Sequence, residues 1–192
     1  MIEKNKSVKS LTKSESLFFI KKKLGNKIIP KFLDFTKQDF KQKKNSLLKK
    51  INLSFREDII IRSSAKDEDG KKLSNAGKYN SIIIKKNEFY KIEESINFLI
   101  SEYTKKNDQI LIQKLIDKPD IAGVLFTKDK NTNSHYYQIS FDTSKRSDLV
   151  TSGKFNPSLK SLIIFKKSKK IPKKFAKLVE TSKKLEKIFM ND

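Results

Sequence analysis

The sequence predicts an α+β fold, in which helices and groups of short strands pack around an apolar core. One observation is a set of apolar residues that recur at helical spacing in the middle of the chain: Ile92, Ile96, Leu99, Ile100 and Tyr103. Another is the second half of the chain, where short segments rich in β-branched and aromatic residues are typical of strands. With 192 residues, the chain is long enough for one domain or two small lobes.

Two pairs of residues have the spacing of a capping box and so predict where helices begin. Thr12 pairs with Glu15, and Thr36 pairs with Asp39. Pro172 is expected to begin a last helix. The residues expected to share one face of these three helices are, in order, Leu17, Ile20, Lys21 and Leu24; Phe40, Leu47, Leu48 and Ile51; and Phe175, Leu178, Val179, Leu185 and Ile188.

Strands are expected between and after these helices. A short extended piece runs from Pro30 to Phe35. Further strands are expected at residues 58–63, 81–85, 110–116, 121–127, 135–142 and 161–166. Tyr137, Ile139 and Phe141 alternate with other residues, which is the period of a strand. Residues 129–134 contain Asp, Asn, Thr and Ser, and they predict a turn between two of the strands.

The chain is strongly basic, with a formal net charge of +22. Of its 44 basic residues only Arg56, Arg62 and Arg146 are arginines, and the lysines are spread along the whole sequence. Specific reading of bases relies heavily on Arg, Asn and Gln at a defined element. We therefore interpret most of the charge as solvated surface and expect no specific nucleic-acid partner. A basic module that binds RNA or another polyanion stays open as an alternative.

Several classes of protein are excluded by what the sequence lacks. There is no cysteine, so disulfides and thiolate chemistry are excluded, and a single histidine cannot build a histidine-based metal site. The sequence has no apolar run of about 18 residues. Its N-terminus is rich in Lys and Ser and has no apolar signal segment. We expect a soluble, cytoplasmic protein with no membrane partner.

The most informative motif follows the apolar run Ile59–Ile61, which is expected to be a buried strand. Arg62, Ser63 and Ser64 follow this run and lead into a polar loop that contains Gly70 and Gly77. Arginine offers rigid donors for oxyanions, and glycine lets backbone amides approach a ligand closely. This layout favours phosphate binding. The alternative is a strand that ends in a solvated arginine, followed by an ordinary loop.

The order of residues resembles a known family. Arg62-Ser63-Ser64-Ala65, followed by Glu68-Asp69 and then by Ser74-Asn75-Ala76-Gly77-Lys78-Tyr79, is similar to the nucleotide-binding domain of the phosphoenolpyruvate synthase and pyruvate phosphate dikinase family. A second match runs from Ile112-Gln113-Lys114 to Gly123-Val124-Leu125-Phe126-Thr127-Lys128-Asp129. The resemblance covers about residues 11–190. The segment 147–153 resembles a Val-x-Ser-Gly element of the branch that includes the glutamine kinase of capsule phosphoramidate synthesis.

The resemblance implies an ATP-grasp-like fold of two small lobes with mixed sheets and flanking helices. About residues 1–105 would form the first lobe and about residues 106–192 part of the second, with the C-terminal part of the fold missing. It also implies the residues that bind ATP. Those expected to contact the phosphates are Lys13, Arg62, Ser63, Ser74, Ala76 and Gly77, and Gln113 is expected to contact adenine.

Each of these assignments has a simpler alternative. Lys13 can be one more surface lysine, the loop that holds Ser74 can be a tight connection, and Gln113 can face solvent. Asp67 and Glu68 lie near Arg62 in the sequence and are interpreted as ion-pair partners, so no residue is assigned to a metal.

The resemblance implies an ATP-dependent dikinase or kinase. Such an enzyme phosphorylates a carrier histidine and then pyruvate or an amide such as glutamine, with Mg²⁺ in the complete enzyme. The family continues into an acidic metal-binding strand, a Gln-x-Arg-Pro segment and a phosphohistidine domain, whereas this chain stops at Asp192. We therefore expect a truncated domain whose partners are nucleotide and the missing domains, and which is inactive alone. A catalytically dead nucleotide-binding protein is a further alternative.

Two residues depart from the family pattern. Lys130 and Asn133 stand where proline and glycine commonly follow the Phe-Thr-x-Asp motif. This change alters a turn without an evident effect on the site. His135 does not match the glycine-rich histidine motif of the carrier domain, so we interpret it as a residue at the end of a strand.

Overall fold

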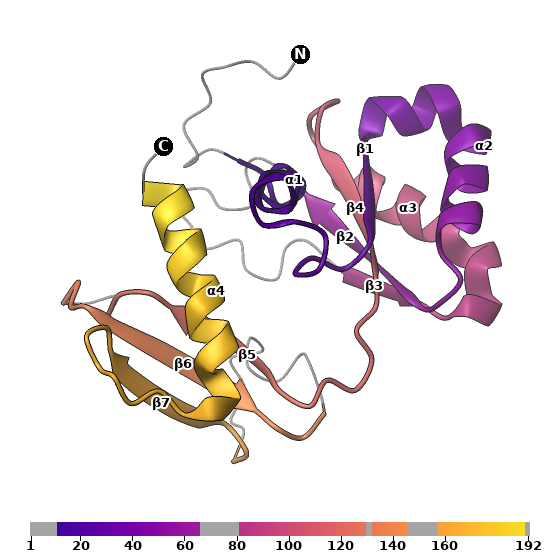
Figure 1. Ribbon diagram of the computed structural model, residues 1–192. Helices are drawn as coiled ribbons and strands as arrows, with labels where there is room; N and C mark the ends of the chain where they lie inside the picture. Colours follow the sequence, from indigo (N-terminus) through magenta and orange to yellow (C-terminus); the bar gives the residue numbers. More distant parts are fainter. Residues whose placement is uncertain (1–10, 66–80, 130–131, 146–156, 191–192) are drawn as a thin grey trace. The chain divides into compact units, whose positions relative to one another are not determined.

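The computed structural model describes residues 11–65, 81–129, 132–145 and 157–190. Helices and strands are both present, so the α+β prediction is confirmed (Figure 1). In this described part of the chain, no helix is both long and apolar enough to span a membrane.

The chain divides into two compact units, Met1–Leu115 and Ile116–Asp192. The sequence predicts a division near residue 105. It lies later because strand β4 (Gln109–Lys114) pairs with strands of the first unit. Each unit has its own sheet and its own apolar core.

The first unit contains a four-stranded sheet with the order β1-β4-β2-β3. The other three strands are β1 (Phe32–Thr36), β2 (Ile59–Ser64) and β3 (Ser81–Ile84). Strands from distant parts of the chain therefore lie side by side, as Figure 1 shows for β1 and β4. The expectation of a mixed sheet is wrong here. β4 enters between β1 and β2 and runs opposite to both, so every described pairing is antiparallel.

The helices of the first unit begin where the sequence predicts. They are α1 (Lys13–Leu24), α2 (Lys37–Ser54) and α3 (Ile92–Ser101), and the short 3-10 helix η2 (Lys86–Lys91) precedes α3. Both capping boxes are present. The backbone N of Glu15 donates to Thr12 Oγ1 at 3.2 Å, and the backbone N of Thr12 donates to Glu15 Oε2 at 2.9 Å. Thr36 and Asp39 make the equivalent pair of bonds at 3.0 Å each.

Alternation along the strands gives this sheet two different faces. One face packs against α2 and α3, and its buried residues are Leu33, Phe35, Ile59, Ile61, Ile84, Ile110 and Ile112. Cross-strand pairing places another set together on the opposite face: Asp34, Ile60, Arg62, Leu111 and Gln113. Helix α1 lies against this second face, where its first turn bonds to Asp34. The sheet therefore has an apolar core on one side and a more polar layer on the other.

The second unit contains a three-stranded sheet with the order β5-β6-β7, and its pairings are also antiparallel. Its elements are β5 (Ala122–Phe126), β6 (Tyr136–Asp142), β7 (Lys160–Phe165) and α4 (Lys173–Met190). Strands that follow one another in the sequence pair here, β5 with β6 and β6 with β7. Phe175 and Val179 of α4 pack on Tyr137, Ile139 and Ile164 of the sheet.

Candidate functional site

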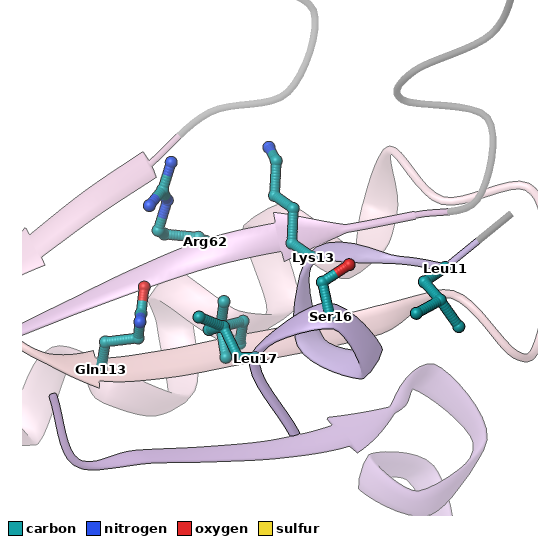
Figure 2. A pocket seen from close by; sticks show the side chains of 7 residues that line it. Leu11, Lys13, Ser16, Leu17, Arg62 and Gln113 are labelled. Atoms are coloured by element: carbon teal, nitrogen blue, oxygen red, sulfur yellow. The ribbon is translucent and has the colours of Figure 1, made fainter. Parts of the chain in front are cut away.

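A pocket opens on the α1 side of the first sheet and encloses about 350 Å³. Three elements, α1, β2 and β4, contribute side chains to it (Figure 2). The residues that line it are Leu11, Lys13, Ser16, Leu17, Arg62, Leu111 and Gln113. Three of the residues identified from sequence motifs therefore line a single cavity: Lys13, Arg62 and Gln113.

The antiparallel register brings the two strand residues together. Arg62 of β2 lies opposite Leu111 of β4, and Ile60 lies opposite Gln113. Residues directly opposite one another point to the same face, so Arg62 and Gln113 both project toward α1. The alternate residues of β4 point into the core. The separate motifs therefore meet because two strands about fifty residues apart pair in this register.

Arg62 has a buried hydrogen-bond donor that the described residues do not satisfy. Its Nε is buried and has no hydrogen-bond partner within the residues that the structure describes. A buried donor left without a partner costs about 1–3 kcal/mol, and more when it is charged. The described residues that line the pocket include two cations and no carboxylate. An anion is the ligand that would satisfy such a donor.

Lys13 is the first residue of α1 and so lies at the N-terminal end of the helix. The helix dipole makes this end partly positive, so an anion is stabilised here. Figure 2 shows the side chains of Lys13 and Arg62 extending to the same side of the cavity. Ser16, one turn further along α1, adds a hydroxyl to the lining.

The part of the pocket around Gln113 is less charged than the part around Lys13 and Arg62. Its side chain is only 9% exposed, so the alternative of a solvent-facing residue is wrong. Leu17 and Leu111 line the cavity beside it. A carboxamide both donates and accepts hydrogen bonds, and apolar neighbours suit a flat, weakly polar ring. The arrangement fits the edge of a base, and the adenine assignment stays a prediction.

The structure does not bring Ser63 into this pocket. Ser63 lies opposite Ile110, is 2% exposed, and belongs to the core face of the sheet. The reason is the two-residue period of a strand, which sends neighbours to opposite sides. Ser64 shares the face of Arg62 instead, and its Oγ accepts a hydrogen bond from the backbone N of Ser14 at 3.0 Å.

Other predicted residues lie outside the described part of the chain. This applies to the phosphate-loop residues Ser74, Ala76 and Gly77, and to the acidic residues Asp67 and Glu68. The segment 147–153, which carried the inference of a branch within the family, also lies outside it.

Some residues that line the pocket are not predicted from the sequence as site residues. Ser16 follows Lys13 by one helical turn, and Leu111 precedes Gln113 by the two residues of a strand period. Both spacings are visible in the sequence. They become informative only once one member of each pair is known to face the ligand.

Within the described residues there is no group of three or more His, Cys, Asp or Glu side chains arranged to hold a metal ion. Asp142 is buried, and its carboxylate accepts bonds from the backbone N of Ser144 at 2.6 Å and from the Ser144 hydroxyl. His135 is exposed and immediately precedes β6, as expected of a residue at a strand end. The cations that line the pocket, Lys13 and Arg62, fit a bound anion.

Comparison of the chain with models of known protein families and with curated protein sequences finds no match.

Proposed function

We propose that the pocket formed by α1, β2 and β4 binds ATP, and that the chain is the nucleotide-binding domain of an ATP-dependent phosphotransferase. One observation carries the proposal: the Arg62 Nε is buried without a partner among the described residues, in a cavity that Lys13 also lines. A second line of support is independent of this geometry. Lys13, Arg62 and Gln113 stand in separate sequence segments that resemble the ATP-binding motifs of one family.

Each residue would contribute a different interaction. Arg62 presents a planar fork of donors that matches phosphate oxygens, and Lys13 supplies a second positive charge at the helix N-terminus. Gln113 would bond to the edge of the base, while Leu17 and Leu111 contact its ring. The phosphates would lie toward the charged end of the cavity and the base toward Gln113.

The reaction that we propose for the parent enzyme is transfer of a phosphoryl group from ATP to a carrier histidine, and then to pyruvate or an amide such as glutamine. This part rests on the family resemblance of the motifs. In the complete enzyme, Mg²⁺ would offset the negative charge of the phosphates. Arg62 and Lys13 would hold the phosphates in place and share their negative charge.

Isothermal titration of the chain with ATP, ADP, AMP and adenosine tests the proposal. Affinity should rise with each added phosphate, because the cations contact phosphate oxygens. A parallel titration with a single-stranded RNA separates this site from general attraction to polyanions. Nonspecific RNA binding should be largely lost between about 50 and 200 mM salt, whereas ATP binding should persist. Equal affinity for ATP and adenosine, or RNA binding that outlasts ATP binding, would contradict the proposal.

A further inference from the structure

Hydrogen bonds anchor the first turn of α1 to the sheet on both sides of Lys13. The residue before it, Thr12, donates from Oγ1 to Gln109 Oε1 at 2.6 Å. The residue after it, Ser14, donates from Oγ to Asp34 Oδ2 at 2.6 Å. The two acceptors stand on different strands, Gln109 on β4 and Asp34 on β1. The backbone of Lys13 is thus fixed between two anchored neighbours.

Further hydrogen bonds stabilise the residues that anchor the first turn of α1. The backbone N of Ser14 donates to Ser64 Oγ at 3.0 Å, and both residues are fully buried. The hydroxyl of Tyr103 donates to the carbonyl of Gln109 at 2.6 Å and accepts from the backbone N of Ser64 at 3.3 Å. The anchors therefore belong to a connected polar network, in which each member restricts the next.

Apolar packing fixes α1 only in part. Phe18 packs edge-on against Phe32 of β1 with ring centroids 4.8 Å apart. Four other apolar residues of the helix are half-buried: Leu17, Phe19, Ile20 and Leu24. Ser14 is the one residue of the helix that is fully buried. Because α1 buries no large side chain completely, the polar anchors at its first turn add to this packing in setting its orientation on the sheet.

We infer that Ser14 and Asp34 are positioning residues, which fix the first turn of α1 so that Lys13 reaches the ligand of the pocket. This inference rests on the proposed function. Neither residue lines the cavity, so neither is expected to touch the nucleotide itself. Without the hydrogen bond between Ser14 and Asp34, the Lys13 ammonium would have a wider range of positions. Binding of phosphate would then have to order the first turn of α1, and this entropic cost would lower the affinity.

Pairs of substitutions distinguish a positioning role of Ser14 from a purely structural one. If Ser14 acts through Lys13, then Ser14→Ala should weaken ATP binding in the wild-type chain and in Arg62→Ala, but not in Lys13→Ala. A general loss of local structure would weaken binding in all three backgrounds. Residues that act on one interaction give non-additive effects, which a double-mutant cycle measures.

The experiment is isothermal titration of the full chain with ATP for these single and double variants, with circular dichroism to verify folding. We expect Ser14→Ala to lower affinity by about 3- to 10-fold, as for loss of one hydrogen bond. Asp34→Ala should act in the same way. Asp34→Asn should restore most of the affinity, because the carboxamide oxygen still accepts the bond from Ser14. This rescue keeps the test decisive even if Asp34→Ala unfolds.

The outcomes separate the inference from the function on which it rests. Loss of affinity in Ser14→Ala that disappears in Lys13→Ala supports the inference. Loss that is fully retained in Lys13→Ala overturns it and leaves ATP binding intact. Wild-type chain that binds no ATP, or binding that neither Lys13→Ala nor Arg62→Ala changes, overturns the proposed function and the inference with it.

Discussion

Arg62 and Gln113 are diagonal neighbours on adjacent antiparallel strands, since Arg62 lies opposite Leu111 and Gln113 follows Leu111 by two residues. Diagonal neighbours of this kind have Cα atoms about 7–8 Å apart, and their side chains lie on the same face of the sheet. A single ligand can therefore contact a guanidinium and a carboxamide that come from motifs far apart in the sequence. This relationship is the geometric basis of the predictions on binding.

Arg62→Ala should weaken ATP binding by about 1.5–3 kcal/mol, because a charge-assisted bond to phosphate is lost. Arg62→Lys should recover only part of this energy, since an ammonium cannot reproduce the planar fork of donors. Isothermal titration provides both values. The matched control is Arg56→Ala, which removes the same charge from an exposed position between α2 and β2. Similar losses of ATP affinity in the Arg56 and Arg62 variants would mean that ATP binding depends only on the overall charge of the protein.

Gln113→Leu should reduce the preference of the pocket for adenine. The substitution keeps the size of the side chain but removes the donor and the acceptor that face the base. We expect the ratio of ATP to GTP affinity to fall toward one, with ATP losing about 1 kcal/mol. Gln42→Leu on the exposed side of α2 is the control. An unchanged ratio would place the base elsewhere.

The sequence predicts the local features of this fold well, because their causes are local. Both capping boxes form where Thr12 and Thr36 predict them, since each needs only residues within one helical turn. The strands also form close to their expected positions. These signals depend on propensity and on the pattern of side chains within one segment.

The features that the sequence does not predict depend on which segments pair. Nothing local in residues 109–114 shows that β4 enters between β1 and β2, and this insertion makes the sheet antiparallel. The family resemblance assigns Ser63 and Arg62 to the same phosphate site, but adjacent residues of a strand face opposite sides of the sheet. Arg62 and Gln113 were each found from a motif, and only the register of β2 with β4 brings them together.

Two carboxylates should affect the pH dependence of stability in opposite directions. Burial raises the pKa of Asp34 above its ordinary value of 3.8, although the bond from Ser14 acts the other way. Hydrogen bonds from the hydroxyl and the backbone N–H of Thr36 lower the pKa of Asp39 below the same value. By linkage, the contribution of Asp34 to stability falls as the pH rises from 3.8 through its folded pKa. The contribution of Asp39 is complete above 3.8 and is lost as the pH falls through its folded pKa.

Urea unfolding from about pH 3 to about pH 7 measures both effects. Relative to wild type, Asp34→Asn should become more stable as the pH rises, and Asp39→Asn should become less stable. Each variant is the control for the other, because both replace aspartate by asparagine in the first unit. Parallel stability curves for the two variants would contradict the assigned causes.

Gly123→Ala should destabilise the second unit. A Cβ at this position would lie 2.4 Å from the backbone oxygen of Ser140 and 3.0 Å from Phe141 Cβ, so strand β6 would have to move. Forcing extra atoms into such a site costs about 1–3 kcal/mol, which thermal unfolding would detect as a lower Tm. Ser161→Ala on the exposed side of β7 is the control. An unchanged Tm in Gly123→Ala would contradict the prediction, because it would show that β5 and β6 accommodate the added Cβ without loss of stability.

The central claim is that the nucleotide binds at Lys13, Arg62 and Gln113, and nuclear magnetic resonance tests it most directly. Titration of isotope-labelled chain with ATP should give saturable shifts of backbone amides in the first turn of α1, in β2 near Arg62 and in β4 near Gln113. In Arg62→Ala the same shifts should need an ATP concentration roughly 10- to 150-fold higher to saturate, as follows from a loss of about 1.5–3 kcal/mol, while the rest of the spectrum is retained. Saturable shifts that avoid these three elements, or none at all at millimolar ATP, would contradict the account.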